Sequence, residues 1–119
     1  MPIIEITKDN FVEEVINSDK PVMLDFYSTT CSLCYMLDSV LKEVADEYGD
    51  IVKVGKINVN MENGLADRFN IAALPTVVIM IGGHVRNKVA GYRNKEYLIN
   101  MFDWWNYRIK PERLKKTGR

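Results

Sequence analysis

The first half of the chain alternates between strand-like and helix-like patterns of hydrophobic residues. A short β-branched run at Ile3–Ile6 predicts a strand, and VMLDFY at Val22–Tyr27 predicts a second strand that is covered on both faces. From Cys34 to Tyr48 apolar residues recur every three or four positions, which predicts a helix that ends at Gly49. Between the two strands lies an amphipathic segment, one face of which carries Phe11, Val12, Val15 and Ile16.

The second half continues the alternation and adds a hairpin. Ile51–Val59 alternates with a period of two and predicts a strand, and Met61–Phe69 predicts a short helix. Thr76–Ile81 and Val85–Ala90 flank Gly82-Gly83, a combination that predicts an antiparallel hairpin. A last helix is expected from Lys95 to about Ile109, and its apolar face carries Tyr97, Leu98, Met101, Phe102 and Trp105.

The predicted order of elements is therefore β α β α β α β β α. Strands that alternate with helices form parallel units with right-handed crossovers, and the final hairpin adds an antiparallel pair. The pattern predicts an α/β protein with a central mixed β-sheet and helices on both faces.

Composition and charge narrow the class of protein. The chain has 119 residues, 47% of them hydrophobic and 27% charged, which fits one globular domain and excludes a disordered chain. Sixteen basic residues balance sixteen acidic ones, so we expect neither nucleic acid nor a membrane as partner. Six basic residues and one acidic residue fall in 107–119, which divides the chain into a domain at 1–106 and a basic C-terminal extension at 107–119. The first residues have no secretory pattern and no run reaches the ~20 apolar residues of a membrane span, so we expect a cytoplasmic protein.

Cys31 and Cys34 are the two cysteines of the chain, and they stand in a CxxC motif between a predicted strand and a predicted helix. In a reducing compartment such a pair is rarely structural, and the small loop that it closes would stabilise the fold by about 2 kcal/mol at best. Redox chemistry is the favoured interpretation. A zinc or iron–sulfur site is the alternative, but zinc needs four ligands and the chain adds only His84, so a second chain would have to contribute. We expect no metal and no cofactor.

The position of the motif assigns the two thiols different roles. Cys31 stands at a helix start, where unpaired N–H groups and the helix dipole favour a thiolate, so it is the expected nucleophile. The main-chain N–H of Leu33 is a further possible donor toward it. Cys34, one turn into the helix, is the expected resolving thiol.

Asp25 interrupts an apolar strand, so its carboxylate either faces solvent at an exposed edge or is buried at a cost of several kcal/mol, which would raise its pKa.

These features resemble the thioredoxin family over residues 2 to about 103. The landmarks appear in family order: the strand LDFY, the CxxC, the helix end ADEYG, KINVN, the ALPT segment, the GG hairpin and Val89-Ala90-Gly91. The chain departs from the family at the motif, where Thr30 replaces a tryptophan and Ser32-Leu33 replaces Gly-Pro. Ser39 stands where the family often has a proline.

The resemblance implies a thioredoxin fold and a thiol–disulfide oxidoreductase that reduces or exchanges protein disulfides through the Cys31–Cys34 couple. It implies that Asp25 relays a proton to and from the resolving thiol, that Lys56 modulates Asp25, and that Pro75 is a cis-proline facing the motif. The implied partners are disulfide-containing proteins and a thioredoxin-reductase-like electron donor, and we expect a monomer. A binding module with the same fold and little turnover is the alternative. An apolar rim is expected to bind substrate, and it comprises Leu33, Val59, Ala73, Leu74, Ala90, Gly91 and Tyr92.

Overall fold

A computed structural model describes residues 2–102, and its elements follow the predicted order. Within these residues no helix is long and apolar enough to cross a membrane. Trp105, which was predicted on the apolar face of the last helix, and the basic extension at 107–119 lie outside the described residues. The elements are β1 (Ile4–Glu5), η1 (Val12–Ile16), β2 (Val22–Tyr27), α1 (Ser32–Tyr48), β3 (Lys53–Asn58), α2 (Asn63–Arg68), β4 (Thr76–Ile81), β5 (His84–Ala90) and α3 (Lys95–Asn100).

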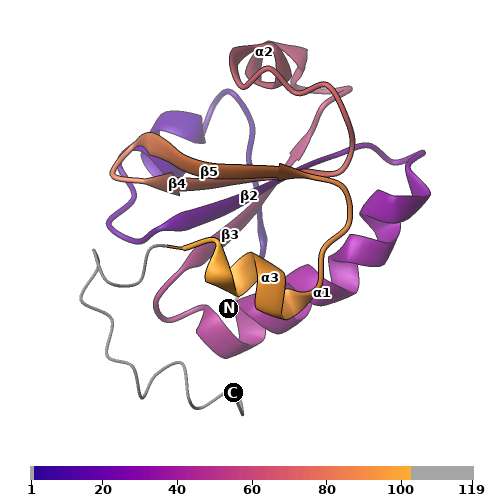
Figure 1. The fold of residues 1–119 in the computed structure, drawn as a ribbon. Helices are drawn as coiled ribbons and strands as arrows, with labels where there is room; N and C mark the ends of the chain where they lie inside the picture. Colours follow the sequence, from indigo (N-terminus) through magenta and orange to yellow (C-terminus); the bar gives the residue numbers. More distant parts are fainter. Residues whose placement is uncertain (1, 103–119) are drawn as a thin grey trace.

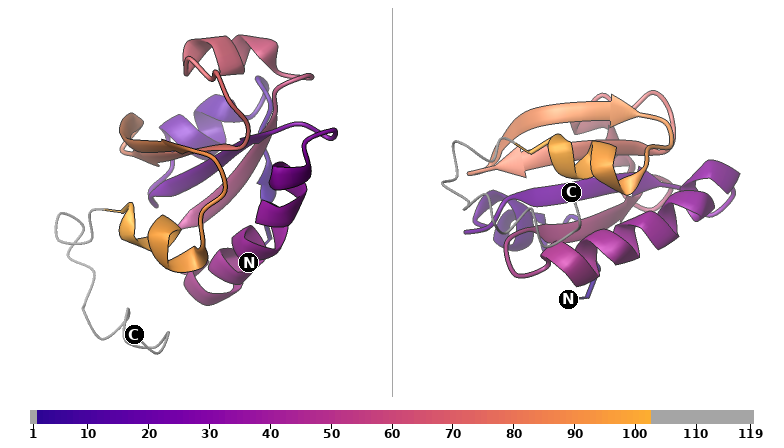
Figure 2. Two further views of the ribbon diagram at one scale, coloured as in Figure 1. Left: turned by 45° about the vertical axis from the view of Figure 1, so that its right-hand side comes forward. Right: turned by 60° about the horizontal axis from the view of Figure 1, so that its bottom comes forward.

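The strands form one mixed sheet in the order β1-β3-β2-β4-β5. β3 pairs in parallel with β1 and β2, whereas β4 pairs antiparallel with β2 and β5. α1 and α3 lie on one face of the sheet, and η1 and α2 lie on the other (Figures 1 and 2). This arrangement confirms the predicted α/β class, with helices on both faces.

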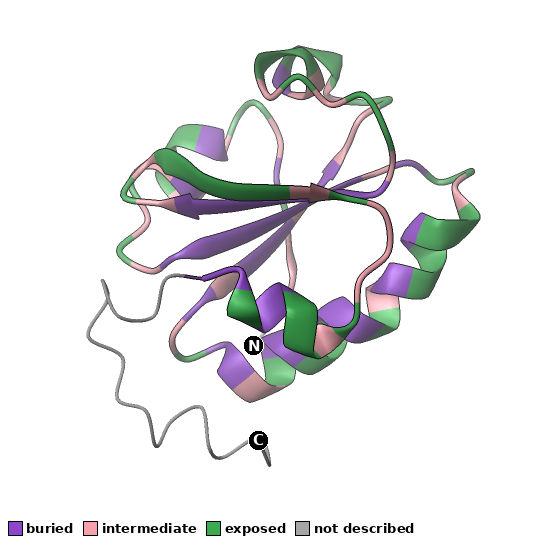
Figure 3. Cartoon of the chain, in the orientation of Figure 1, coloured by how far each residue is buried: buried purple, intermediate pink, exposed green. Residues whose placement is uncertain are grey.

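Each face of the sheet has its own hydrophobic core. The core under α1 and α3 contains the whole predicted apolar face of α1: Leu37, Val40, Leu41, Val44, Ala45 and Tyr48. The second core joins the sheet to η1 and α2 through Phe11, Val15 and Leu65. Figure 3 shows the central strands buried and β5 exposed along the edge, so β2 is enclosed on both faces as its apolar sequence predicted.

The predicted burial of two residues, Val12 and Tyr97, was wrong. Val12 is 57% exposed because η1 is a turn of π-helix, in which Asn17 N–H donates to the Val12 carbonyl and the buried face differs from that of an α-helix. Tyr97 is exposed, and Ile99 is buried beside Leu98 in its place.

α1 ends where predicted, with Gly49 as its C-cap residue, but the backbone of this glycine differs from that of most glycines that follow a helix. Gly49 is right-handed (φ −63°) and does not use the left-handed conformation that favours glycine. The Tyr48 carbonyl instead accepts from the N–H groups of Ile51 and Val52, and Lys20 Nζ donates to the Gly49 carbonyl. By contrast, Gly82 and Gly83 have φ values of 58° and 81°, as the predicted hairpin turn requires.

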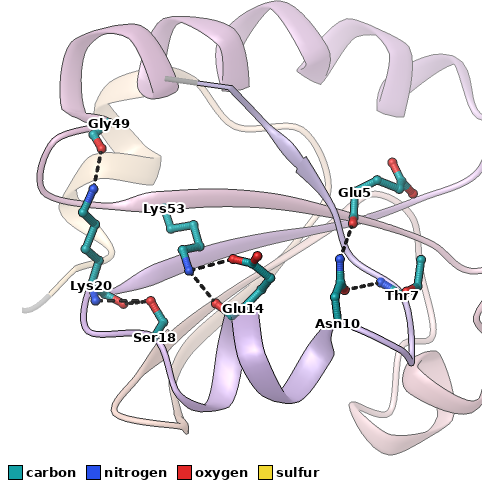
Figure 4. A network of polar contacts seen from close by, with 8 residues as sticks. All are labelled: Glu5, Thr7, Asn10, Glu14, Ser18, Lys20, Gly49 and Lys53. Atoms are coloured by element: carbon teal, nitrogen blue, oxygen red, sulfur yellow. Dashed lines mark hydrogen bonds and ion pairs between the residues drawn. The ribbon is translucent and has the colours of Figure 1, made fainter.

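A polar network holds the N-terminal segment to the sheet (Figure 4). Lys53 on β3 binds both the carboxylate of Glu14 (3.0 Å) and its main-chain carbonyl (2.9 Å), which fixes η1 against the sheet. Asn10 accepts from the N–H of Thr7 and donates to the carbonyl of Glu5, so the loop after β1 is closed by its own side chains. These contacts stabilise the scaffold on which the opposite end of β2 carries the CxxC motif.

Candidate redox site

Cys31 is the N-cap residue of α1, at the edge of the sheet where β2 ends. Its backbone is extended (φ −102°, ψ 112°), and its Sγ accepts a hydrogen bond from the N–H of Cys34 at 3.2 Å. The sulfur therefore takes the place that a serine or aspartate oxygen occupies at other helix starts. The helix begins at Ser32, two residues earlier than predicted, and the N–H that reaches the sulfur belongs to Cys34 rather than to Leu33.

The two thiols are free and differ in exposure. Cys31 is half-buried, whereas Cys34 is 2% exposed. Burial, followed by the hydrogen bond with Cys31, raises the pKa of Cys34 to about 12, and a main-chain hydrogen bond from Ser28 acts in the opposite direction. Near neutral pH Cys34 is therefore a protonated thiol.

Asp25 is fully buried in β2, and this excludes the exposed edge position. Neither carboxylate oxygen has a hydrogen-bond partner among the described residues. Burial raises the pKa of Asp25 to about 7, against the lowering effect of the positive charge of Lys56. The negative charges of Asp38 and Glu5 add to the increase. An unpartnered carboxyl group of this kind accepts and returns a proton near neutral pH.

Lys56 stands directly beside Asp25, because the two residues are partners in the parallel ladder of β2 and β3. Its Nζ forms an ion pair with Asp38 Oδ1 of α1 at 2.6 Å and lies 4.2 Å from the centre of the Tyr27 ring. Within residues 2–102 it makes no ion pair with Asp25. Lys56 thus acts on Asp25 through its charge, without a direct hydrogen bond.

A cavity of about 180 Å³ lies beside Lys56, Asp38 and the two cysteines. Both cysteines line it, so solvent has access to the side of the redox pair that faces β2 and β3. The other lining residues are Tyr27, Ser28, Thr29, Tyr35, Asp38 and Lys56.

The Leu74–Pro75 peptide bond is cis, as the resemblance implied. Pro75 is buried, and its carbonyl accepts from the N–H of Gly91 at 2.7 Å. This bond continues the β4–β5 pairing past Thr76 and Ala90 to the edge where β2 and β3 end. The loop before β4 and the loop after β5 therefore lie at the same edge of the sheet as the CxxC motif.

The predicted rim comprises Leu33 in the first turn of α1 and six residues in the loops and strand ends at this edge. Leu33, Ala73 and Ala90 are exposed, and Leu33 retains 43% of its accessible surface. The remaining four are half-buried, because their side chains or main chain also pack against the scaffold: Val59, Leu74, Gly91 and Tyr92. The rim thus presents an uneven surface of small and aliphatic groups.

The sequence reasoning missed Asp38, which lies one helical turn after Cys34 and pairs with Lys56. A spacing of four residues on a helix places two side chains on the same face, and that spacing was the available signal. His84, the histidine considered as a zinc ligand, is exposed on β5. Across residues 2–102, no three His, Cys, Asp or Glu side chains are grouped so that they would hold a metal ion.

The comparisons with known proteins agree with this geometry. The family model described as thioredoxin matches residues 2–103. Thioredoxin of Griffithsia pacifica is 38% identical over 84% of this chain and 92% of its own length. Thioredoxin of Alicyclobacillus acidocaldarius is 37% identical over 78% of this chain and 88% of its own. The chain therefore belongs to the thioredoxin family, whose members are disulfide oxidoreductases.

Proposed function

We propose that this thiol–disulfide oxidoreductase reduces or exchanges the disulfides of other proteins, with Cys31 as nucleophile and Cys34 as resolving thiol. The observation that carries the proposal is the asymmetry of the pair. One sulfur is accessible and accepts a main-chain hydrogen bond, the other is buried and protonated, and an unpartnered carboxyl group is buried on the strand that leads to them.

In the first step the Cys31 thiolate attacks one sulfur of the client disulfide. A bond forms between Cys31 Sγ and that sulfur, the client S–S bond breaks, and the released client thiolate takes up a proton. The Cys34 N–H that points at Sγ, together with the start of α1, stabilises the negative charge before the attack.

In the second step Cys34 gives its proton to the Asp25 carboxylate and attacks Cys31 Sγ. The Cys31–Cys34 disulfide forms, the mixed disulfide breaks, and the second client sulfur leaves as a thiolate that is then protonated. The client has gained two electrons from the cysteine pair and two protons from solvent, and the proton of Cys34 remains on Asp25 until Asp25 releases it to solvent. Asp25, with a pKa of about 7, is ionised often enough at neutral pH to accept the proton.

The loops around the motif supply the proposed docking surface. The rim residues Leu33, Ala73 and Ala90 are exposed at the edge where the thiols lie. The buried Pro75 ties the loop that carries Ala73 to the end of β5, because its carbonyl accepts from the N–H of Gly91. An extended client segment that contacts main chain and small apolar groups there is recognised with little dependence on its sequence. Lys56 modulates the proton transfer through its charge on Asp25.

Turnover requires two electrons from a donor, and a thioredoxin-reductase-like enzyme is the proposed source. A relative from Mycobacterium leprae, named as a bifunctional thioredoxin reductase/thioredoxin, is 33% identical over 81% of this chain, which covers 21% of that longer protein. Joining of the two activities in one relative supports a reductase as partner. We further propose that the protein acts in the cytoplasm and as a monomer.

Reduction of insulin by the protein with dithiothreitol as electron source tests the proposal. We expect rapid precipitation of the insulin B chain, none with Cys31→Ser, and slower turnover with Asp25→Asn at pH 7. A wild-type protein that binds a disulfide client but leaves insulin oxidised would support the binding module instead. Asp46→Asn removes an exposed carboxylate of α1 and serves as the matched control for Asp25→Asn. We expect this control to turn over at the wild-type rate.

A further inference from the structure

Asp38 lies beside the redox pair and has no part in the exchange described above. It is the fourth residue after Cys34 on α1, and it lines the cavity of about 180 Å³ that both cysteines share. It also lines a larger surface groove, of about 620 Å³, together with Glu5, Tyr35 and Lys56. Asp38 thus stands between the thiols and the polar residues of β1 and β3.

The strongest contact of Asp38 is with Lys56. Their side chains lie 2.6 Å apart and are partly shielded, with 41% and 18% of their accessible surface remaining. On its other side the Lys56 ammonium lies over the Tyr27 ring, and the Tyr27 hydroxyl donates to the Glu5 carboxylate at 2.9 Å. Lys56 is therefore held from two directions while the oxygens of its neighbour Asp25 receive no hydrogen bond from any described residue.

We propose that Asp38 is a positioning residue for the proton transfer at Asp25: it engages Lys56 and so prevents that lysine from ion-pairing with the buried carboxylate. The inference rests on the proton role proposed above for Asp25. Without Asp38, Lys56 still has two acidic ladder partners, Glu5 and Asp25. The Glu5 carboxylate already accepts from the Tyr27 hydroxyl, whereas the Asp25 carboxyl has no partner among the described residues, so Asp25 is the alternative that gains most from the lysine. An opposite charge within hydrogen-bonding distance lowers the pKa of a carboxylic acid, and an Asp25 carboxylate with a lower pKa is a weaker base for Cys34.

Charged or titratable groups surround Asp25 on three sides, and the effect of Asp38 follows from their sum. Asp38 acts twice in the same direction, since it neutralises Lys56 and its own negative charge also disfavours a second anion nearby. β4 contributes only the apolar ladder partner Val77. The groups that interact electrostatically with Asp25 are Glu5 from β1, Tyr27 from β2, Lys56 from β3, and Cys34 and Asp38 from α1.

The test is an NMR titration of the Asp25 side-chain carboxyl carbon in the oxidised protein, in which the thiols do not titrate. Asp38→Asn keeps the shape of the side chain and removes its charge, and the Asp25 pKa should fall by about one pH unit. Asp38→Glu should restore most of the wild-type value. Lys56→Met should raise the pKa, and the exposed Asp46→Asn on the same helix should leave it unchanged.

The kinetic counterpart is the pH profile of client release from the preformed mixed disulfide. Its midpoint should shift downward by the same amount in Asp38→Asn, and the substitution should not move the profile in an Asp25→Asn background. An unchanged or increased Asp25 pKa in Asp38→Asn, or an equal fall in Asp46→Asn, would overturn the inference. If Asp25→Asn releases client at the wild-type rate, the proposed proton role fails, whereas the NMR shift still reports whether Asp38 controls Lys56.

Discussion

Replacing Asp25 by asparagine should stabilise the reduced protein at neutral and alkaline pH. The side chain is fully buried, and its pKa rises from 3.8 in an unfolded chain to about 7 in the fold. The folded state therefore binds the proton more tightly than the unfolded state does. The contribution of Asp25 to the free energy of unfolding is largest below about pH 4, falls as the pH rises toward 7, and stays constant above that pH.

The magnitude follows from the size of this increase. Each pH unit corresponds to about 1.4 kcal/mol, so ionising Asp25 in the fold costs roughly 4 kcal/mol at pH 8. Asparagine has the shape of the protonated acid and carries no charge, so the variant escapes this cost. The gain in the free energy of unfolding should be under about 1 kcal/mol near pH 4 and grow to about 4 kcal/mol at pH 8.

Urea unfolding between pH 4 and pH 9, with both thiols kept reduced, measures this difference. The exposed control Asp46→Asn should follow the wild-type protein throughout. A variant no more stable than wild type at pH 8 would refute the reasoning. So would a stability gain of equal size at pH 4, because a constant gain reflects packing rather than ionisation.

Further predictions concern the glycines and the two thiols. Gly55→Ala should lower the free energy of unfolding by about 1–3 kcal/mol, because the added Cβ would lie 2.7 Å from Ile6 Cγ1. Urea denaturation measures this loss, and a variant as stable as the wild-type protein would contradict the prediction. Gly64→Ala in α2 meets nothing within 4 Å and should raise the same quantity by roughly 0.5–1 kcal/mol. Brief iodoacetamide treatment of the reduced protein at pH 7, followed by peptide mass spectrometry, should modify Cys31 and spare Cys34; equal modification is the contrary result.

Much of the fold could be predicted from hydrophobic periodicity, because the central strands and α1 bury continuous apolar faces. The α1 face and the strands β2 and β4 are of this kind, and the paired glycines at 82–83 fix the hairpin. Val12 and Tyr97 were predicted to be buried but are exposed, because the periodicity argument assumes regular α-helical turns and long helices. A π-turn and a six-residue segment bury different residues.

The site divides in a similar way. Cys31, Cys34, Asp25 and Pro75 were identified because the motif order is specific and because a carboxylate in an apolar strand is unusual. The donor to Cys31 was misplaced, since the sulfur occupies the N-cap position and the third N–H of the helix reaches it. Asp38 was missed although its spacing of four residues from Cys34 was visible, because an aspartate on an amphipathic helix ordinarily faces solvent. Its role appears only when the strand register sets Lys56 beside Asp25.

Trapping of the mixed disulfide tests the central claim most directly. The reduced Cys34→Ser and Cys31→Ser variants are each incubated with a disulfide-bonded protein, quenched with acid, and analysed by non-reducing electrophoresis and mass spectrometry. The account predicts that Cys34→Ser accumulates a covalent complex joined through Cys31, and that Cys31→Ser accumulates almost none, because Cys34 is buried and protonated. A complex joined through Cys34 in the Cys31→Ser variant, or none in either variant, would contradict the assignment of nucleophile and resolving thiol.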